Sequence, residues 1–182
     1  MARDVFIIGE IRDGSIIGEA LEATAAAVQI AEGGEVTGGL CGSYPDRVAE
    51  EWIRYGVDRV VTLQDNEAVN PNRFVRAVRS EFMRENPDLV IAGHAGYGEE
   101  LAFRLAESLD LPLVTEVIGI TRYLGSLILL QEENWHTLYG DEEEKLIATI
   151  QPGRFRVPDQ DPEYPGLIEP VGAKELKIRQ PV

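Results

Sequence analysis

A glycine-rich segment near the middle of the chain is the first candidate for chemistry. It lies between a strand-like run and a helix-like run. Its residues are Gly93, His94, Ala95, Gly96, Tyr97 and Gly98. In an open parallel sheet, ligands bind at the carboxyl ends of the strands, where a glycine-rich turn lets backbone N–H groups approach an anion. The segment is therefore a candidate anion or nucleotide loop.

The spacing of these glycines matches no established nucleotide motif. The pattern G-x-x-G-x-G differs from the dinucleotide fingerprint, and a P-loop would need a Lys after its last Gly. Glu99 and Glu100 follow instead, and they complement a helix dipole but repel a phosphate. A tight strand-to-helix turn without a ligand explains the same residues, and it is the interpretation that we favour.

The other reactive residue types do not form a catalytic set. The chain contains two histidines, His94 and His136, which excludes a site built from several histidines. Its single cysteine, Cys41, can form no internal disulfide or Cys-based zinc site, and we expect it to be a small buried residue. Ser43 lacks the G-x-S-x-G context of a nucleophile and is predicted to cap a helix. We therefore expect no catalysis by this chain alone.

Two charged clusters have competing interpretations. The acidic run at residues 141–144 is predicted to be a solvated turn, because consecutive carboxylates on a turn do not converge on one point. Arg73, Arg76 and Arg79 form a basic stripe at intervals of three residues along a predicted helix. The stripe is either a solvated face paired with nearby acids or a docking patch for an acidic partner.

Length and composition limit the class of protein. A chain of 182 residues with 44% hydrophobic residues suits one globular domain. The 32 acidic residues outnumber 17 basic ones, and the net charge of −15 argues against nucleic acid and anionic membranes as partners. Because the chain has no apolar run of about 20 residues and no signal-like start, we expect a cytoplasmic protein without membrane insertion.

The first two-thirds of the chain alternate strand and helix patterns. Strands are predicted at residues 5–9, 35–40, 57–63 and 89–93. Helices are predicted at residues 17–31, 43–55, 72–86 and 99–109. Such alternation with short connections predicts a parallel sheet that is covered by helices on both faces.

The pattern changes after residue 113. Four β-rich runs follow, separated by turn residues, and they suggest antiparallel strands at residues 114–123, 126–131, 135–139 and 146–151. Six of the ten prolines then lie in the last 31 residues, which predicts an extended arm. We therefore divide the chain into a domain at 1–156 and a Pro-rich arm at 157–182, which is predicted to pack on the domain or on a second subunit and to support self-association.

Several segments in this order resemble one family. The opening strand Phe6-Ile-Ile-Gly-Glu10, the run Pro87-Asp-Leu-Val-Ile-Ala-Gly93 and the segment Ala148-Thr-Ile-Gln-Pro-Gly-Arg-Phe155 are similar to electron transfer flavoprotein alpha subunits. The resemblance covers about residues 4–156. It implies the family's N-terminal domain, which is a three-layer, Rossmann-like (adenine nucleotide hydrolase-like) parallel sheet with added antiparallel strands.

The resemblance also sets expectations for cofactors and partners. The family's second domain, which holds most FAD contacts, has no counterpart after Phe155, and Glu99 and Phe103 stand where the family has a basic residue and a proline. We therefore expect no cofactor in the isolated chain, with FAD supplied through a missing domain or a partner. The implied function is a structural or docking component that pairs with a beta-like subunit and a separate FAD-domain protein.

One alternative concerns AMP, which the related beta subunits hold in an equivalent domain. AMP is therefore a candidate ligand here, and a stand-alone AMP-binding module is the alternative function.

Overall fold

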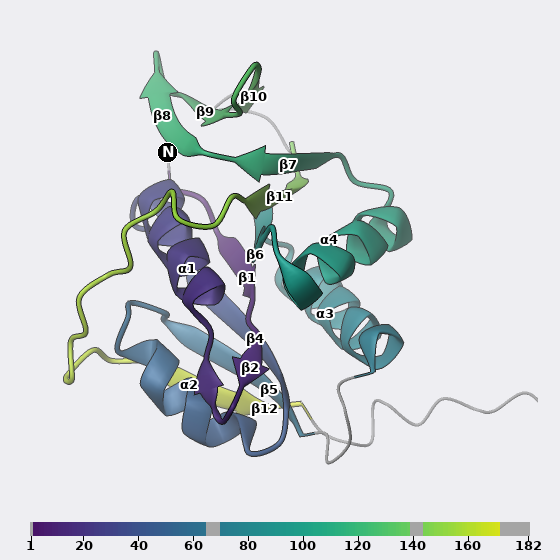
Figure 1. The fold of residues 1–182 in the computed structure, drawn as a ribbon, viewed down its shortest axis with the longest axis vertical. Coiled ribbons are helices and arrows are strands. Elements are labelled where there is room, and N and C mark those ends of the chain that lie inside the picture. Colours follow the sequence, from purple (N-terminus) through teal and green to yellow (C-terminus); the bar gives the residue numbers. More distant parts are fainter. Residues whose placement is uncertain (1, 65–69, 139–143, 172–182) are drawn as a thin grey trace, which may run out of the picture.

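The structure is a computed structural model that describes residues 2–64, 70–138 and 144–171. Within those residues, its centre is a seven-stranded sheet in which every neighbouring pair of strands runs parallel (Figure 1). From edge to edge, the strands are β12 (Leu167–Pro170), β5 (Arg59–Gln64), β4 (Val36–Gly42), β1 (Val5–Ile8), β6 (Leu89–Gly93), β11 (Leu146–Ile150) and β7 (Leu113–Val117). The predicted α/β class with a parallel sheet is confirmed.

Alternating side chains explain why both faces of the sheet are covered. Val5 and Ile7 of β1 belong to one hydrophobic core, whereas Phe6 and Ile8 belong to a second core on the other face. Because successive side chains of a strand point to opposite faces, a continuous apolar run needs a partner layer on each side.

Four helices in the described part of the chain provide these layers. The bounds are α1 (Gly18–Ala31), α2 (Pro45–Ile53), α3 (Pro71–Glu85) and α4 (Gly96–Leu109). Helices α1 and α2 cover one face of the sheet, and α3 and α4 cover the other (Figure 1). No helix in the described part of the chain has the length and apolar character needed to cross a membrane.

Two small antiparallel sheets are added to this frame. One is the hairpin of β2 (Ile11–Arg12) and β3 (Ser15–Ile16). The other contains β8 (Gly119–Tyr123), β9 (Ser126–Leu130) and β10 (Trp135–Leu138). The three-stranded sheet is attached to α1, because Gln29 Nε2 donates to the Ile120 carbonyl at 3.1 Å and Arg122 Nη2 donates to the Ile30 carbonyl at 2.6 Å.

Two runs that were predicted to be antiparallel belong to the parallel sheet, so that part of the prediction is wrong. The run at 146–151 forms β11, which lies parallel to both β6 and β7. The run at 114–123 divides into β7 of the main sheet and β8 of the small sheet. The three-stranded sheet takes the place of a crossover helix between β7 and β11. Parallel strands are usually connected through a helix, and this segment has no amphipathic helical pattern. The sequence therefore suggested antiparallel hairpins where the connection between two parallel strands is a small sheet.

The start of α2 also differs from the prediction. Tyr44, with a left-handed φ of 53°, is the N-cap residue, and Ser43 lies one residue before it. Pro45 occupies the first helical position, where its fixed φ and missing N–H are tolerated. The proline determines the start of the helix, and the predicted Ser43 cap is wrong.

Residues 157–171 run in extended form along the domain and end in β12. Tyr164 Oη donates to Asp58 at 2.7 Å, and the backbone N–H of Asp161 donates to the Arg54 carbonyl at 2.7 Å. Strand β12 then pairs with β5, and Pro170 lies on this edge strand, where a missing N–H is tolerated. The boundary at residue 156 and the self-association of the arm stay predictions. Residues 172–182 lie outside the described residues.

An ion-pair network fastens β12 to the sheet. Glu169 of β12 accepts from Arg59 Nη1 at 2.9 Å and from Arg84 Nη1 at 2.8 Å. Arg59, which is largely buried, also pairs with Glu35 at 2.9 Å and Glu85 at 3.2 Å. The hydrogen bonds from Arg84 and Arg59 lower the pKa of Glu169 to about 2, well below its ordinary value of 4.5. The network therefore holds the edge strand by charge as well as by backbone pairing.

Replacing Glu169 by Gln should destabilise the fold in a pH-dependent way. At pH 7 we expect a loss of no more than about 1 kcal/mol, because solvent screens a carboxylate whose side chain is 42% exposed. A folded-state pKa below the unfolded value means that this stabilisation is present above about pH 4.5 and fades as the pH falls towards about 2. Urea unfolding between pH 7 and pH 3 measures the difference, with Glu163→Gln as a control on the same segment. A penalty that stays constant over this pH range would contradict the assignment.

Trp52 is the largest fully buried side chain, and it needs glycines beneath it. Its ring lies over β4, where a Cβ at Gly38 would stand 2.4 Å from ring atom Cζ3. On the other face of β4, a Cβ at Gly39 would stand 2.7 Å from Phe6 Cζ. The two glycines that weaken this segment as a strand by propensity are the ones that make room for two aromatic rings.

A Gly38→Ala substitution should lower the free energy of unfolding by about 2 to 3 kcal/mol, because the added methyl group overpacks a core that cannot move Trp52 cheaply. Gly18→Ala is the matched control, since a Cβ there meets no atom within 4 Å. Chemical denaturation followed by circular dichroism compares the two variants. Equal stability of both would rule out the proposed clash.

Candidate functional site

The candidate site lies where the order of the sheet reverses. After β1 the chain adds β4 and β5 on one side, and it then adds β6 on the other side of β1. The loops after β1 and β6 therefore leave towards opposite faces, which opens a crevice at the carboxyl ends of these strands. Ligands of open α/β sheets bind at such switch points. The glycine-rich segment after β6 is at this position.

In the structure, the loop within the predicted glycine-rich segment is shorter than the sequence suggested. Gly93 is the last residue of β6, and Gly96, Tyr97 and Gly98 form the first turn of α4. Only His94 and Ala95 lie between strand and helix. The predicted start of the helix at Glu99 is therefore three residues too late, because glycines in a helical first turn carry no sequence signal of a helix.

Close packing explains two of the three glycines, and backbone conformation explains the third. A Cβ at Gly93 would stand 2.7 Å from Glu19 Cβ, and one at Gly98 would stand 3.0 Å from the Gly93 carbonyl oxygen. Gly96 has a φ of +57°, which disfavours residues with a side chain. Strand β6 and helices α1 and α4 thus approach one another closely here. Ala95, the N-cap residue, provides no side-chain hydrogen bond to the helix end. The binding role of the segment stays a prediction.

His94 is fixed by β11 and faces two carboxylates. Its Nδ1 lies 2.8 Å from Thr149 Oγ1, and its backbone N–H donates to the Ile150 carbonyl at 2.7 Å. Its Nε2 lies 3.8 Å from an oxygen of Glu99 and 3.8 Å from an oxygen of Glu116. Sequence reasoning missed Thr149 and Glu116. A threonine inside the apolar run of β11 was the available signal for Thr149.

The opposite side of the crevice is also acidic. Glu10 follows β1, and its Oε1 accepts from Arg12 Nη2 at 2.8 Å. Its Oε2 is buried and has no hydrogen-bond partner within the described residues. The hydrogen bond and the charge of Glu10 raise the pKa of Arg12. With Glu19 acting on Arg12 as well, this edge contains more carboxylates than cations, which disfavours a phosphate.

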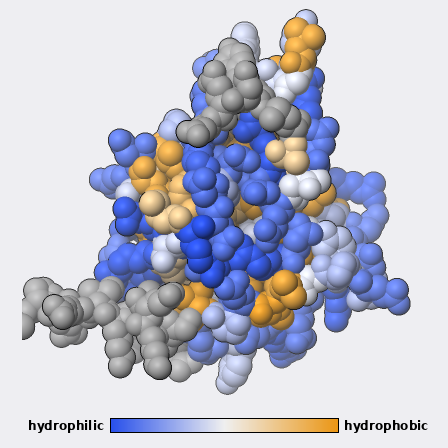
Figure 2. All heavy atoms as spheres, turned by 180° about the vertical axis from the view of Figure 1, so that it is seen from behind, coloured by the Kyte–Doolittle hydropathy of each residue, from blue (hydrophilic) through white to orange (hydrophobic). Residues whose placement is uncertain are grey.

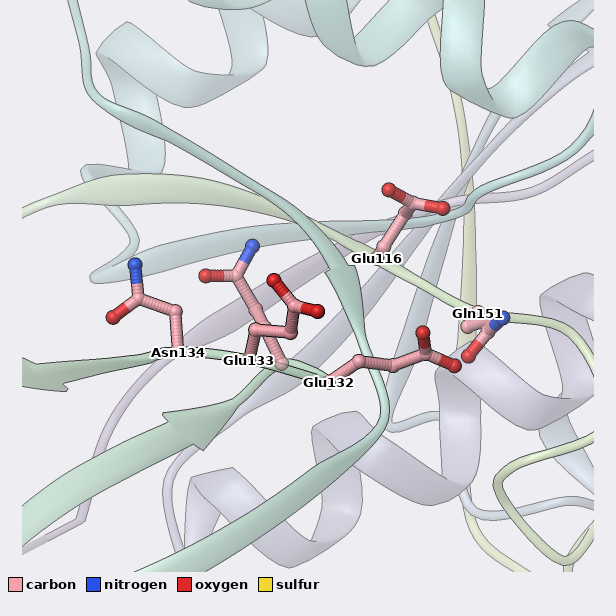
Figure 3. A pocket seen from close by; sticks show the side chains of 6 residues that line it. Glu116, Glu132, Glu133, Asn134 and Gln151 are labelled. Atoms are coloured by element: carbon pink, nitrogen blue, oxygen red, sulfur yellow. The ribbon is translucent and has the colours of Figure 1, made fainter.

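A polar cavity adjoins this edge at the ends of β7 and β11. It has a volume of about 320 Å³ and is lined by Glu116, Gln131, Glu132, Glu133, Asn134 and Gln151. Glu116 belongs to β7, Gln151 directly follows β11, and Glu132, Glu133 and Asn134 lie in the turn between β9 and β10 (Figure 3). Arg154 closes one side, since it donates to Gln151 Oε1 at 3.0 Å and to Glu132 Oε1 at 3.2 Å. The lining favours a cationic group over an anion.

The other reactive residues that the sequence analysis considered lie outside this site. Cys41 is buried in the core on the α3–α4 face, and His136 lies half-buried in β10. Residues 141–143 of the predicted acidic turn lie outside the described residues. Among the residues that the structure describes, no three His, Cys, Asp or Glu side chains are arranged to hold a metal ion.

The fold and this edge define an open, doubly wound α/β domain with an electronegative switch point. The electron transfer flavoprotein domain model matches residues 5–176. The chain therefore belongs to the electron transfer flavoprotein domain family, and its relatives include alpha subunits, as the sequence resemblance predicted.

Individual relatives agree with this assignment. The chain is 31% identical to the electron transfer flavoprotein subunit alpha of Bacillus subtilis (strain 168), over 98% of this chain and 57% of the relative. It is 28% identical to the alpha subunit of Syntrophomonas wolfei subsp. wolfei, over 81% of this chain and 48% of the relative. It is 25% identical to the acryloyl-CoA reductase electron transfer subunit beta of Anaerotignum propionicum, over 69% and 36% of the two chains. The chain thus spans about half the length of the curated relatives that it matches, or less.

Proposed function

We propose that this chain is the N-terminal domain of an electron transfer flavoprotein alpha-type component and works as a docking module. The observation that carries this proposal is the family match over nearly the whole chain, combined with coverage of only 57% of the Bacillus subtilis alpha subunit. On this basis the chain pairs with a beta-like subunit in the cytoplasm. The FAD-binding domain comes from a part of the protein outside these residues or from a partner chain.

The three-stranded antiparallel sheet offers a surface for such pairing. Cross-strand partners share a face, and the register pairs Tyr123 with Ser126, Thr121 with Ile128 and Leu130 with Trp135. Together with Gly119 and Thr137, these residues form the outward face. Leu127 and Leu129 point the other way and are buried in the core of the α1–α2 face. The outward face therefore contains apolar, hydroxyl and glycine residues and no charged residue.

An uncharged sheet face is unusual on this protein. The chain has a net charge of −15, and Figure 2 shows the back of the molecule as mostly hydrophilic with separate apolar patches. Of the nine large apolar side chains that are exposed within the described residues, four lie on this small sheet or its turn. These are Tyr123, Leu124, Leu130 and Trp135, with Leu124 88% exposed. An uncharged patch with aromatic anchors is typical of a protein–protein interface.

Trp135→Glu should reduce pairing with the beta-like subunit. Trp135 is 67% exposed, so the substitution leaves the fold intact while it places a charge in the proposed contact. A tagged chain produced in its native cell should recover about tenfold less beta-like subunit, by quantitative mass spectrometry, than the unmodified chain. Tyr44→Glu is the matched control, since Tyr44 is 77% exposed away from this sheet. Equal recovery with both variants would contradict the assigned surface.

AMP binding at the switch point is the second candidate function. Its support is the location of the glycine-rich segment at the carboxyl ends of β1 and β6, where open sheets bind nucleotides. Against it stand the carboxylates of Glu10 and Glu99 at the same edge. We therefore rank the docking function first.

Purified chain should contain neither flavin nor stoichiometric AMP. It should lack absorbance near ~450 nm, because flavin brings its own chromophore to a protein. Heat denaturation followed by chromatography should release well under one AMP per chain. One AMP per chain would establish the alternative function, and yellow protein that persists through gel filtration would overturn the cofactor prediction.

A further inference from the structure

A groove between α3 and α4 is lined by two arginines, whereas the protein as a whole has a net charge of −15. The two helices lie side by side on the face of the sheet opposite α1 and α2 (Figure 1). The groove has a volume of about 420 Å³ and is lined by Asn70, Asn72, Val75, Arg76, Arg104, Glu107 and Ser108. It therefore combines two guanidinium groups with several neutral polar groups.

Most oxygen atoms of the neutral lining residues are already used inside the protein. Asn70 Oδ1 accepts from the backbone N–H groups of Asn72 and Arg73 at 3.0 and 3.3 Å. Asn72 Oδ1 accepts from Arg104 Nη1 at 3.1 Å. What remains available on these two asparagines is the NH2 group, which only donates. The groove consequently offers two amide NH2 groups as hydrogen-bond donors.

The arginines add positive charge to these donors. Arg76 is exposed and makes no hydrogen bond or ion pair within the described residues. Arg104 donates to Glu100 Oε1 from Nε at 2.9 Å and from Nη2 at 2.7 Å, and to Asn72 from Nη1, which leaves one N–H group on each Nη atom. Arg79 Nε donates to the Ser108 carbonyl at 3.3 Å beside the groove. Glu107 is the one carboxylate among the lining residues. In a protein with a net charge of −15, this is a local reversal of sign.

We propose that this groove binds an acidic segment of a partner polypeptide. Carboxylates accept two parallel hydrogen bonds from a guanidinium group, so Arg76 and Arg104 suit Asp and Glu side chains. A nucleotide fits less well, because no aromatic ring is among the described residues that line the groove and Asn70 already occupies the first free N–H groups of α3. The surface lies on the opposite side of the sheet from α1, to which β8–β10 are attached. The inference thus goes beyond the proposed pairing, and its failure leaves that pairing intact.

The test measures binding of a fluorescent deca-glutamate peptide to the full chain at low salt by fluorescence anisotropy. Deca-lysine serves as the opposite-charge probe. Arg76→Glu should weaken deca-glutamate binding about five- to tenfold, because it exchanges an attraction for a repulsion. Arg156→Glu is the matched control with the same change of net charge. Its side chain is 87% exposed outside the groove, and we expect a change below about twofold. Glu107→Gln should strengthen binding about twofold, since it removes the competing carboxylate.

Three results would overturn the proposal. One is the absence of saturable deca-glutamate binding to the unmodified chain. Another is an equal loss with Arg76→Glu and Arg156→Glu, which would assign binding to net charge alone. The third is displacement of the peptide by ATP or a single-stranded oligonucleotide at lower concentrations than by unlabelled deca-glutamate, which would assign the groove to phosphates. Circular dichroism melting curves that match the unmodified chain establish that each variant is folded.

Discussion

The buried indole of Trp52 holds three elements of the domain in place. It projects from α2 over β4, where Gly38 leaves room for the ring, and a Cβ at Gly9, just after β1, would also meet it at 2.6 Å. Its Nε1 donates at 2.7 Å to Thr24 Oγ1 of α1, which itself donates to the Ala20 carbonyl at 2.9 Å. Because a buried N–H without a partner is costly, this pair fixes the position of α1 as well as that of α2. The loop from β1 to α1, which contains Glu10, takes its position from this arrangement.

Charge is distributed unevenly over the surfaces that this core supports. The carboxyl-end edge of the sheet gathers Glu10, Glu99 and Glu116 around the crevice, with His94 among them. The antiparallel sheet presents an uncharged outward face, and the α3–α4 groove presents arginines. These surfaces differ in local potential although the net charge is strongly negative, and the attraction of a partner depends on local potential as well as on net charge.

Membership of the electron transfer flavoprotein family suggests a role for these surfaces. In flavoproteins the flavin carries the redox chemistry, and the protein supplies its position and its surroundings. The carboxylate-rich edge at the switch point is compatible with the proposed docking role. The edge strand β12 is held in the sheet by the ion pairs of Glu169 with Arg59 and Arg84.

The sequence by itself determined the family, the parallel core and the existence of the four helices. Their signals are local, since apolar periodicity and turn residues act within a few positions. The tertiary structure alone decided that β11 lies between β6 and β7, because a buried strand has the same apolar pattern in parallel and antiparallel neighbours. It also decided that Glu116 faces His94 and that Arg76 and Arg104 share a groove, since these residues come from separate elements. Which distant residues meet depends on how the helices and strands pack, and that packing is governed by shape complementarity, as between Trp52 and Gly38, which no short-range pattern records.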